Sequence, residues 1–167
     1  MSLSVIGGLA WTWVSRPDAS SGAQSTQQTQ APPLQLALLD GGEITLTQLR
    51  GKVVVLNFWA TWCPPCRAEM AELNETHAAL NGRGLIVLGV NQMQSASVVQ
   101  HFMQEQQLSF PIALDSAGEA SNRYRVAALP TTFIIDKTGH VREVLHGGGL
   151  TRGLIESKVN ALISEKQ

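Results

Sequence analysis

The fold of this chain is decided by the stretch VVVLNFWATWCPPCRAE, residues 53–69. Its first seven residues are nearly all apolar and rich in β-branched side chains, which is typical of a central strand covered on both faces. Pro64 suits the first turn of a helix, because its missing N–H would have no intrahelical partner there. We therefore expect a buried strand that leads into a helix over Pro64–Leu80, with Cys63 at the junction.

Strands and helices alternate on both sides of this stretch. Before it, two short runs flank the turn Asp40-Gly41-Gly42 and predict a β-hairpin over 34–39 and 43–46. After it, the pattern predicts in order strand 85–90, helix 95–107, strand 110–114, helix 117–124, strands 131–135 and 140–145, and helix 151–164. Such alternation indicates an α/β fold with a central mixed sheet flanked by helices.

The two cysteines of the chain form a Cys-Pro-Pro-Cys motif at Cys63 and Cys66. A disulfide between them would close a very small loop and would add little stability, so chemistry explains the pair better than stapling. At a helix N-terminus, free backbone N–H groups and the helix dipole favour a thiolate, so we expect a depressed pKa for Cys63. Cys63 would attack the disulfide of a partner, and Cys66 would then resolve the mixed disulfide.

Other uses of the two thiols fit the sequence less well. A zinc site needs four ligands, and none of the four histidines pairs with another at metal-ligand spacing. A Cu(I)-binding or delivery module would use the same thiolates, but no histidine or methionine is convincingly placed with them. A peroxidase of the peroxiredoxin group would need a peroxidatic cysteine in a T-x-x-C-like setting well before the resolving one. The stretch Thr61-Trp62-Cys63-Pro64-Pro65-Cys66 does not supply it. Copper delivery and peroxidase activity stay as alternatives, and we expect no metal and no cofactor beyond the redox-active disulfide.

The N-terminal part of the chain differs from the rest in composition. Residues 1–15 contain an apolar stretch that is too short to span a bilayer and carries Trp11 and Trp13 near its end. We interpret it as a truncated membrane anchor or signal remnant. Residues 16–33 are rich in Ser, Gln, Thr, Gly and Pro, which predicts a flexible linker. The compact domain would then occupy residues 34–167.

Two longer segments carry a resemblance to a known family. LRGKVVVLNFWATWCPPCRAE, residues 49–69, resembles the membrane-tethered TlpA/ResA-type thioredoxin-like proteins of the redoxin, or AhpC/TSA-related, superfamily. ALPTTFIID, residues 128–136, is similar to their second signature. The resemblance covers residue 34 to the C-terminus. It implies a thioredoxin-like fold with an N-terminal β-hairpin and a central βα insertion, and a thiol–disulfide oxidoreductase of the protein-disulfide reductase type.

The resemblance also assigns residues that bind the substrate. Pro130 matches a cis-proline that packs beside the disulfide and, with Leu129, would present backbone to an extended substrate segment; a cis X–Pro bond is otherwise uncommon. Trp62 would shield the disulfide, and it would line the substrate-binding surface together with Pro64 and Pro65. These five residues are the expected contacts of a protein partner.

A third catalytic residue is implied beside the two cysteines. Glu69 matches a glutamate that is implicated in tuning the cysteines of this family. It lies one helical turn past Cys66, so the two side chains share a helix face. A half-buried carboxylate there would have a raised pKa and could relay protons to Cys66. Asn57 stands where thioredoxin has a buried aspartate, and its amide cannot transfer a proton at neutral pH.

The expected partners follow from the charge and from the resemblance. A net charge of −1, with 12 basic and 13 acidic residues, gives no reason to expect nucleic acid. The resemblance implies protein substrates with thiols or disulfides, such as the haem-binding cysteines of apocytochrome c, and a membrane disulfide reductase as electron donor. It further implies an N-terminal membrane tether and an extracytoplasmic location, in the periplasm or at the outer face of the cytoplasmic membrane. We expect a monomer that acts as a reductant, although Pro64-Pro65 does not fix the reduction potential.

Overall fold

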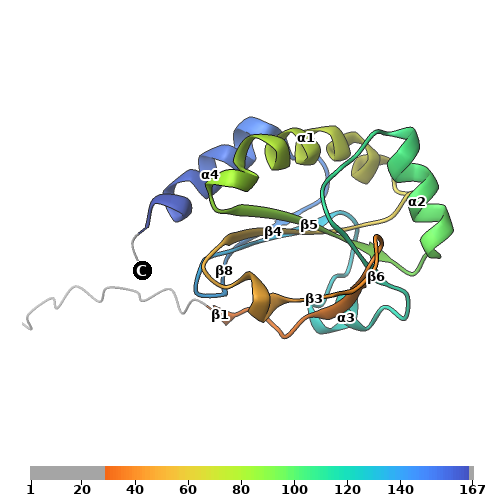
Figure 1. Ribbon diagram of the computed structural model, residues 1–167, viewed down its shortest axis with the longest axis horizontal. Coiled ribbons are helices and arrows are strands. Elements are labelled where there is room, and N and C mark those ends of the chain that lie inside the picture. Colours follow the sequence, from red (N-terminus) through yellow and green to blue (C-terminus); the bar gives the residue numbers. More distant parts are fainter. Residues whose placement is uncertain (1–28, 166–167) are drawn as a thin grey trace, which may run out of the picture.

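An eight-stranded mixed sheet forms the centre of the computed structural model, which describes residues 29–165 (Figure 1). The strand order is β1-β8-β7-β4-β5-β6-β2-β3. β4 is parallel to β5, β5 is parallel to β6, and β7 is antiparallel to β4. The strands are β1 (Thr29–Gln30), β2 (Gln35–Leu38), β3 (Glu43–Thr45), β4 (Val53–Trp59), β5 (Leu85–Gln92), β6 (Ile112–Asp115), β7 (Thr131–Ile135) and β8 (His140–His146).

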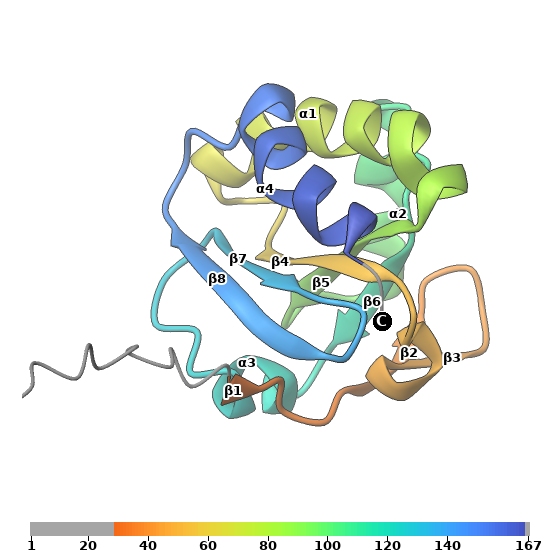
Figure 2. The same cartoon turned by 90° about the vertical axis from the view of Figure 1, so that its left-hand side faces the viewer.

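Helices cover both faces of the sheet. α1, α2 and α4 lie over one face, and the short α3 lies on the opposite side (Figures 1 and 2). The helices are α1 (Pro64–Leu80), α2 (Ala96–Glu105), α3 (Glu119–Arg123) and α4 (Arg152–Ser164). The predicted α/β architecture, with its hairpin before β4 and its additional strand and helix after α1, is confirmed.

The central strand divides the hydrophobic core into two clusters. Every residue of β4 is buried, as the continuous apolar run predicts. Val53, Val55 and Trp59 belong to the cluster under α1, α2 and α4, which also contains both cysteines. Val54, Leu56 and Phe58 belong to the second cluster, on the α3 side. The strand therefore ends between two packed layers, which fixes the position of the loop that follows it.

Residues 29–33, which the sequence assigned to the linker, form part of the fold. β1 pairs with the edge of β8, and the next residue, Ala31, donates its N–H to the carbonyl of Gly139 at 2.9 Å. Ala31 and Leu34 are buried, so the compact part of the chain starts before the expected boundary at residue 34. Backbone pairing holds β1, and such pairing needs no apolar pattern. The predicted anchor and most of the predicted linker lie outside the described residues.

Helix ends also differ from the expected ones. α2 ends at Glu105, two residues before the predicted end, and Gln107 takes a left-handed backbone conformation with φ 53°. β6 starts at Ile112, because the preceding Pro111 has no N–H to donate to the ladder. Only the carbonyl of Pro111 pairs with β5, where it accepts the N–H of Gly89. Within residues 29–165, none of the helices combines the length and the apolar character that crossing a membrane requires.

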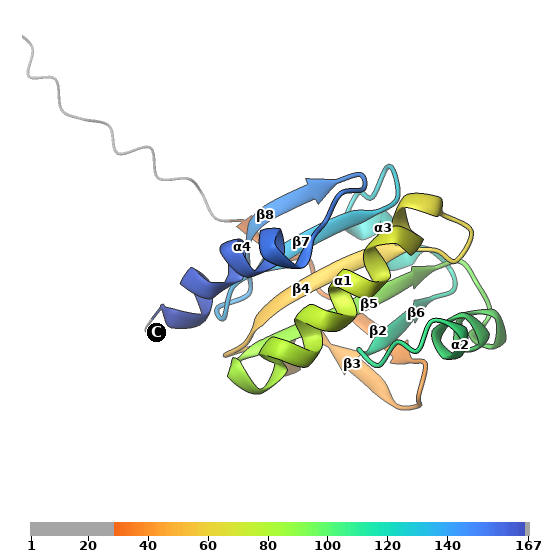
Figure 3. The same ribbon diagram turned by 90° about the horizontal axis from the view of Figure 1, so that it is seen from above.

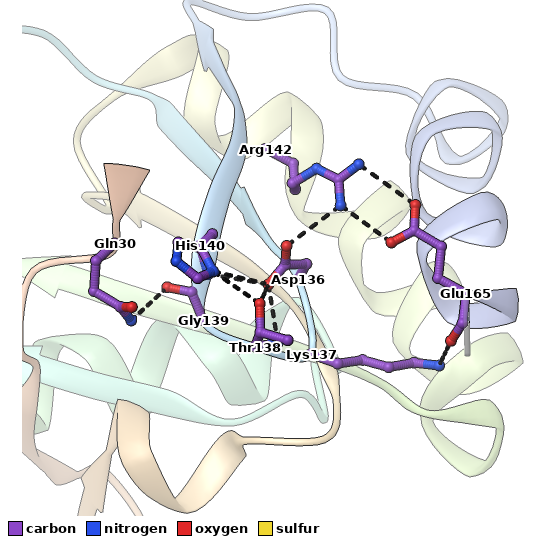
Figure 4. A network of polar contacts seen from close by, with 8 residues as sticks. All are labelled: Gln30, Asp136, Lys137, Thr138, Gly139, His140, Arg142 and Glu165. Atoms are coloured by element: carbon purple, nitrogen blue, oxygen red, sulfur yellow. Dashed lines mark hydrogen bonds and ion pairs between the residues drawn. The ribbon is translucent and has the colours of Figure 1, made fainter. Parts of the chain in front are cut away.

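The turn between β7 and β8 is tied to the C-terminal end of α4 (Figure 4). The Arg142 guanidinium donates to Asp136 Oδ2 at 3.3 Å and to Glu165 Oε2 at 3.1 Å. Lys137 Nζ donates to the carbonyls of Ile163 and Glu165 at 2.6 and 2.8 Å. These carbonyls have no intrahelical partner, so the lysine serves as the cap of the helix.

Candidate active site

Cys63 and Cys66 form a disulfide at the start of α1. Cys63 is the N-cap residue of the helix, and its sulfur accepts the N–H of Cys66 at 3.3 Å. Pro64 and Pro65 occupy the first two helical positions, where the absent N–H groups leave no bond unmade. The junction predicted from the sequence is present, with Cys63 beside the free N–H groups at the positive end of the helix.

Solvent reaches the disulfide poorly in this oxidised form. Cys63 exposes 3 % of its surface and Cys66 exposes none. Pro64 and Pro65 are exposed, and Trp62 exposes 67 % of its surface. The outer cysteine is therefore the more accessible of the two. The exposed side chains around it, Trp62, Pro64 and Pro65, form the rim of the disulfide.

The peptide bond between Leu129 and Pro130 is cis, as expected. Pro130 is buried, and its carbonyl accepts the N–H of Gly147 at 2.9 Å. Leu129 is partly buried and packs against the core cluster that contains both cysteines. Leu129 also packs against the second cluster, on the α3 side, and the segment directly precedes β7.

Glu69 has its carboxyl group inside the protein, one helical turn after Cys66. Only 2 % of the residue is exposed, and Oε1 accepts the N–H of Leu150 at 3.0 Å. Oε2 has no partner among the described residues. Burial raises the pKa of Glu69 from 4.5 to about 7, and the Leu150 hydrogen bond opposes this only in part. The carboxyl group can therefore gain or lose a proton near neutral pH.

Asn57 lies on β4 and is completely buried. Its amide nitrogen donates to Thr132 Oγ1 at 2.8 Å across to β7. Its oxygen Oδ1 lacks a hydrogen-bond partner in the part of the chain that the structure describes. Asn57 carries no charge, so the buried carboxyl group closest in sequence to the cysteines is that of Glu69, on the same helix as Cys66.

A glycine-rich loop, residues 147–150, closes over Glu69, and the sequence analysis did not identify it. A Cβ atom on Gly148 would lie 2.9 Å from Cβ of Pro65, so the loop touches the Cys-Pro-Pro-Cys turn directly. Just beyond the loop, the N–H of Arg152 donates to Glu72 Oε2 at 2.7 Å. Two carboxyl groups of α1 therefore bind the start of α4. The run of three glycines was the available signal, but in sequence it indicates only a turn.

A second unforeseen contact fixes the loop before Cys63. The side-chain oxygen of Gln94 accepts the N–H of Thr61 at 2.8 Å, and its nitrogen donates to Thr61 Oγ1 at 2.8 Å. Asn91 Nδ2 donates to the same Gln94 oxygen at 3.0 Å. A lone glutamine after a strand carries no motif, so this pairing could not be read from the sequence.

Across residues 29–165, no cluster of three or more His, Cys, Asp or Glu side chains could hold a metal ion.

Comparison with known proteins decides the family. The model of the AhpC/TSA family matches residues 28–144. The chain belongs to the AhpC/TSA family. Within it, the thiol-disulfide oxidoreductase ResA of Geobacillus thermodenitrificans is 43 % identical over 117 residues, which cover 70 % of this chain and 67 % of the relative. ResA of Oceanobacillus iheyensis is 34 % identical over 140 residues, covering 81 % and 72 %.

Solved structures agree with this family assignment. A putative thiol:disulfide interchange protein DsbE from Chlorobium tepidum superposes with a TM-score of 0.77 at 29 % identity, covering 82 % of this chain and 97 % of the other. A secreted thiol-disulfide isomerase from Corynebacterium glutamicum gives 0.75 at 28 % identity, covering 81 % and 86 %. This AhpC/TSA family member is therefore a ResA-like thiol–disulfide oxidoreductase with a thioredoxin-like fold, and the predicted family, fold and enzyme class are confirmed.

Proposed function

We propose that this enzyme reduces disulfides of exported proteins outside the cytoplasm, with the haem-site cysteines of an apocytochrome c as one substrate class. The buried Glu69 carboxyl group beside the cysteines is the observation that carries the direction of the reaction. A dithiol is a strong reductant when its thiolate is poorly stabilised, whereas oxidants such as DsbA have a stabilised reduced form. An ionised Glu69 opposes a second negative charge on the nearby sulfur, which favours the disulfide of this protein over its dithiolate.

The positive charge nearest in sequence to the cysteines does not offset this effect. The Arg67 guanidinium donates to the Thr61 carbonyl at 3.5 Å and lies 5.4 Å from the centre of the Phe102 ring. The thiolate of Cys63 would therefore depend on backbone N–H groups and on the helix dipole. Such limited stabilisation supports a reducing role.

The reaction transfers two electrons from the dithiol to the partner. The Cys63 thiolate attacks one sulfur of the partner disulfide, a mixed disulfide forms, and the other partner sulfur leaves as a thiolate. Glu69 takes the proton of the Cys66 thiol, and the resulting thiolate attacks Cys63 Sγ. The Cys63–Cys66 disulfide forms, and the second partner sulfur leaves as a thiolate.

The partner would bind along the rim of the disulfide. Trp62, which precedes Cys63 in the sequence, supplies an exposed aromatic surface. Pro64 and Pro65, which follow Cys63, are exposed as well. We assign Leu129 and Pro130 to the contact with an extended segment of the partner, since they form the cis peptide bond before β7 and Leu129 packs against the cluster that contains the cysteines. Aromatic and rigid side chains of this kind supply contact area at low entropic cost.

The enzyme would work outside the cytoplasm, tethered by its N-terminus, and would receive its electrons from the membrane. The relative from Corynebacterium glutamicum is a secreted protein, and the apolar N-terminal stretch of this chain supports the proposal as the remnant of an anchor or signal. A membrane disulfide reductase would then return electrons to the Cys63–Cys66 disulfide, and the enzyme would act as a monomer.

The equilibrium reduction potential of the cysteine pair tests the direction. It is measured on the full chain against glutathione or dithiothreitol redox buffers. We expect a value at or below the roughly −270 mV of thioredoxin. A value near the roughly −120 mV of DsbA would show an oxidant instead. Reduction of a disulfide-bonded peptide that contains a Cys-x-x-Cys-His haem site, with a serine-substituted peptide as control, tests the substrate class.

A further inference from the structure

Met93 combines an unfavourable backbone conformation with an exposed apolar side chain. It follows β5 and has φ 56°, a left-handed conformation that residues with a Cβ atom seldom adopt. Its side chain is 68 % exposed. Gln107 and Arg125 share this backbone conformation, but of these three residues only Met93 exposes an apolar side chain, and that combination points to a use outside the folded core.

The loop that carries Met93 is held in place from two sides. The N–H of Met93 donates to the Asp115 carbonyl at 3.0 Å, at the end of β6. The Asp115 carboxylate in turn accepts N–H groups of Ala120 and Ser121 at 3.1 and 2.8 Å. The Met93 side chain passes over Gly118, where an added Cβ would lie 3.4 Å from its sulfur. Met93 is thus presented by a fixed backbone.

The same loop is joined to the active-site loop. β4 and β5 are parallel neighbours with Trp59 opposite Asn91, so their following loops leave the same edge of the sheet (Figure 3). The paired hydrogen bonds between Gln94 and Thr61 join the two loops directly. Met93 and Trp62, which adjoin Gln94 and Thr61 in sequence, therefore lie on two hydrogen-bonded loops at the same end of the sheet as Cys63.

These two residues also differ from the other exposed apolar side chains of the described chain. Met93 and Trp62 are 68 % and 67 % exposed, whereas the remaining large apolar side chains at the surface, Val98, Leu154 and Val144, are 46 %, 38 % and 37 % exposed. The two most exposed large hydrophobic residues of the described chain thus occur on the two loops at the disulfide end of the sheet.

We propose that Met93 is a specificity residue that contacts apolar side chains flanking the reacting disulfide of the protein partner. The occupant is a segment of the partner chain, because Cys63 can react only when that segment reaches the end of the sheet at which the loops of Trp62 and Met93 lie. A methionine side chain is flexible and polarisable, so it can fit different apolar neighbours. This inference rests on the exchange with protein partners proposed above and adds the chemistry that selects them.

The test uses two disulfide-bridged peptides of equal length, one with leucine and valine beside its cysteines and one with serine. The reduced full-length protein is mixed with each peptide, and the ratio of the two second-order rate constants is measured. We expect the native protein to favour the apolar peptide by about fivefold to tenfold, the effect of losing one well-packed contact residue. Met93→Gly and Met93→Asn, which both fit a left-handed backbone, should bring the ratio close to one.

Gln107→Gly is the matched control. Gln107 has φ 53°, so glycine relieves the same backbone conformation at the opposite end of α2. This variant should keep the native ratio. Equal rates for the two peptides with the native protein, or an unchanged ratio in Met93→Gly, would overturn the assignment. So would a shifted reduction potential in Met93→Gly, because the residue would then act through the disulfide itself. The absolute rates report the proposed activity, and the ratio alone reports Met93.

Discussion

Glu69 is an acid whose neutral form suits the fold better than its anion. Its pKa is raised from 4.5 to about 7, with burial as the main cause. A carboxyl group with a raised pKa in the folded state binds its proton more tightly there than in the unfolded chain. Its contribution to stability is therefore complete below about pH 4.5 and is lost as the pH rises through about 7.

This linkage gives a prediction for Glu69→Gln in the oxidised protein, where the cysteines do not titrate. The free energy of unfolding of the native protein should fall relative to that of the variant by roughly 2–3 kcal/mol between pH 4.5 and pH 8. Urea unfolding at several pH values measures it. Parallel pH profiles of the two proteins would show that Glu69 ionises without cost.

The same substitution tests the proton relay in the reduced protein. Glu69→Gln removes the group that accepts the Cys66 proton, so resolution of a mixed disulfide at Cys63 should slow by about 100-fold near pH 7. The thiol titration of Cys66 should also shift. Stopped-flow release of a chromophoric thiol reports the resolution step, and an unchanged pH profile of that step would rule out the relay.

At the level of elements, α1 and α4 are joined by the glycine-rich loop, residues 147–150, rather than by apolar packing alone. Gly148 lies against Pro65, and Glu69 and Glu72 accept the backbone N–H groups of Leu150 and Arg152. The first turn of α4 is therefore fixed by the helix that carries the cysteines. A change in this loop must reach the active site.

Gly148→Ala tests this connection. The added Cβ would lie 2.9 Å from Cβ of Pro65, so the loop or the helix start must shift, at a cost of about 1–3 kcal/mol. Gly82→Ala is the control, because no atom lies within 4 Å of a Cβ at that position. Thermal unfolding compares the two variants. If both variants unfold like the native protein, the loop is not tightly packed on Pro65.

Lys137 provides a prediction at the opposite end of α4. Lys137→Ala removes the hydrogen bonds to the carbonyls of Ile163 and Glu165, at a cost of about 1 kcal/mol. Amide hydrogen exchange should become faster in the last turn of α4 and stay unchanged in α1. Uniformly faster exchange in both helices would indicate global destabilisation and not the loss of a cap.

Over the whole molecule, residues 29–34, which precede β2, belong to the fold. The Tyr124 hydroxyl donates to the Pro32 carbonyl at 2.7 Å, and Leu34 is buried. A chain that starts at residue 35 should therefore be less stable than one that starts at residue 29 by about 2–4 kcal/mol, from the lost leucine burial and hydrogen bonds. Urea unfolding of the two truncated proteins measures the difference. Equal stabilities would mean that β1 and Leu34 only rest on the surface.

The sequence predicted best those parts that side-chain burial specifies. β4 and α1 follow from an apolar run and from helical periodicity, with Cys63 as the N-cap of α1 and Cys66 and Glu69 on the helix at fixed spacing. β1 was missed because backbone pairing with β8 leaves no pattern in side chains. The Gln94 contact with Thr61 was missed because the two residues are 33 positions apart and carry no motif.

The burial of the disulfide has a consequence for the traffic of electrons around this protein. The extracytoplasmic compartment proposed for it is oxidising, so disulfides of other proteins persist there. Cys63 shows only 3 % of its surface, so molecules that collide at random with the oxidised enzyme seldom meet the sulfur. Burial therefore limits unspecific thiol–disulfide exchange. Exchange is fast only with a donor or acceptor whose shape lets it reach Cys63, and exchange with other molecules stays slow even where the reduction potentials would permit it.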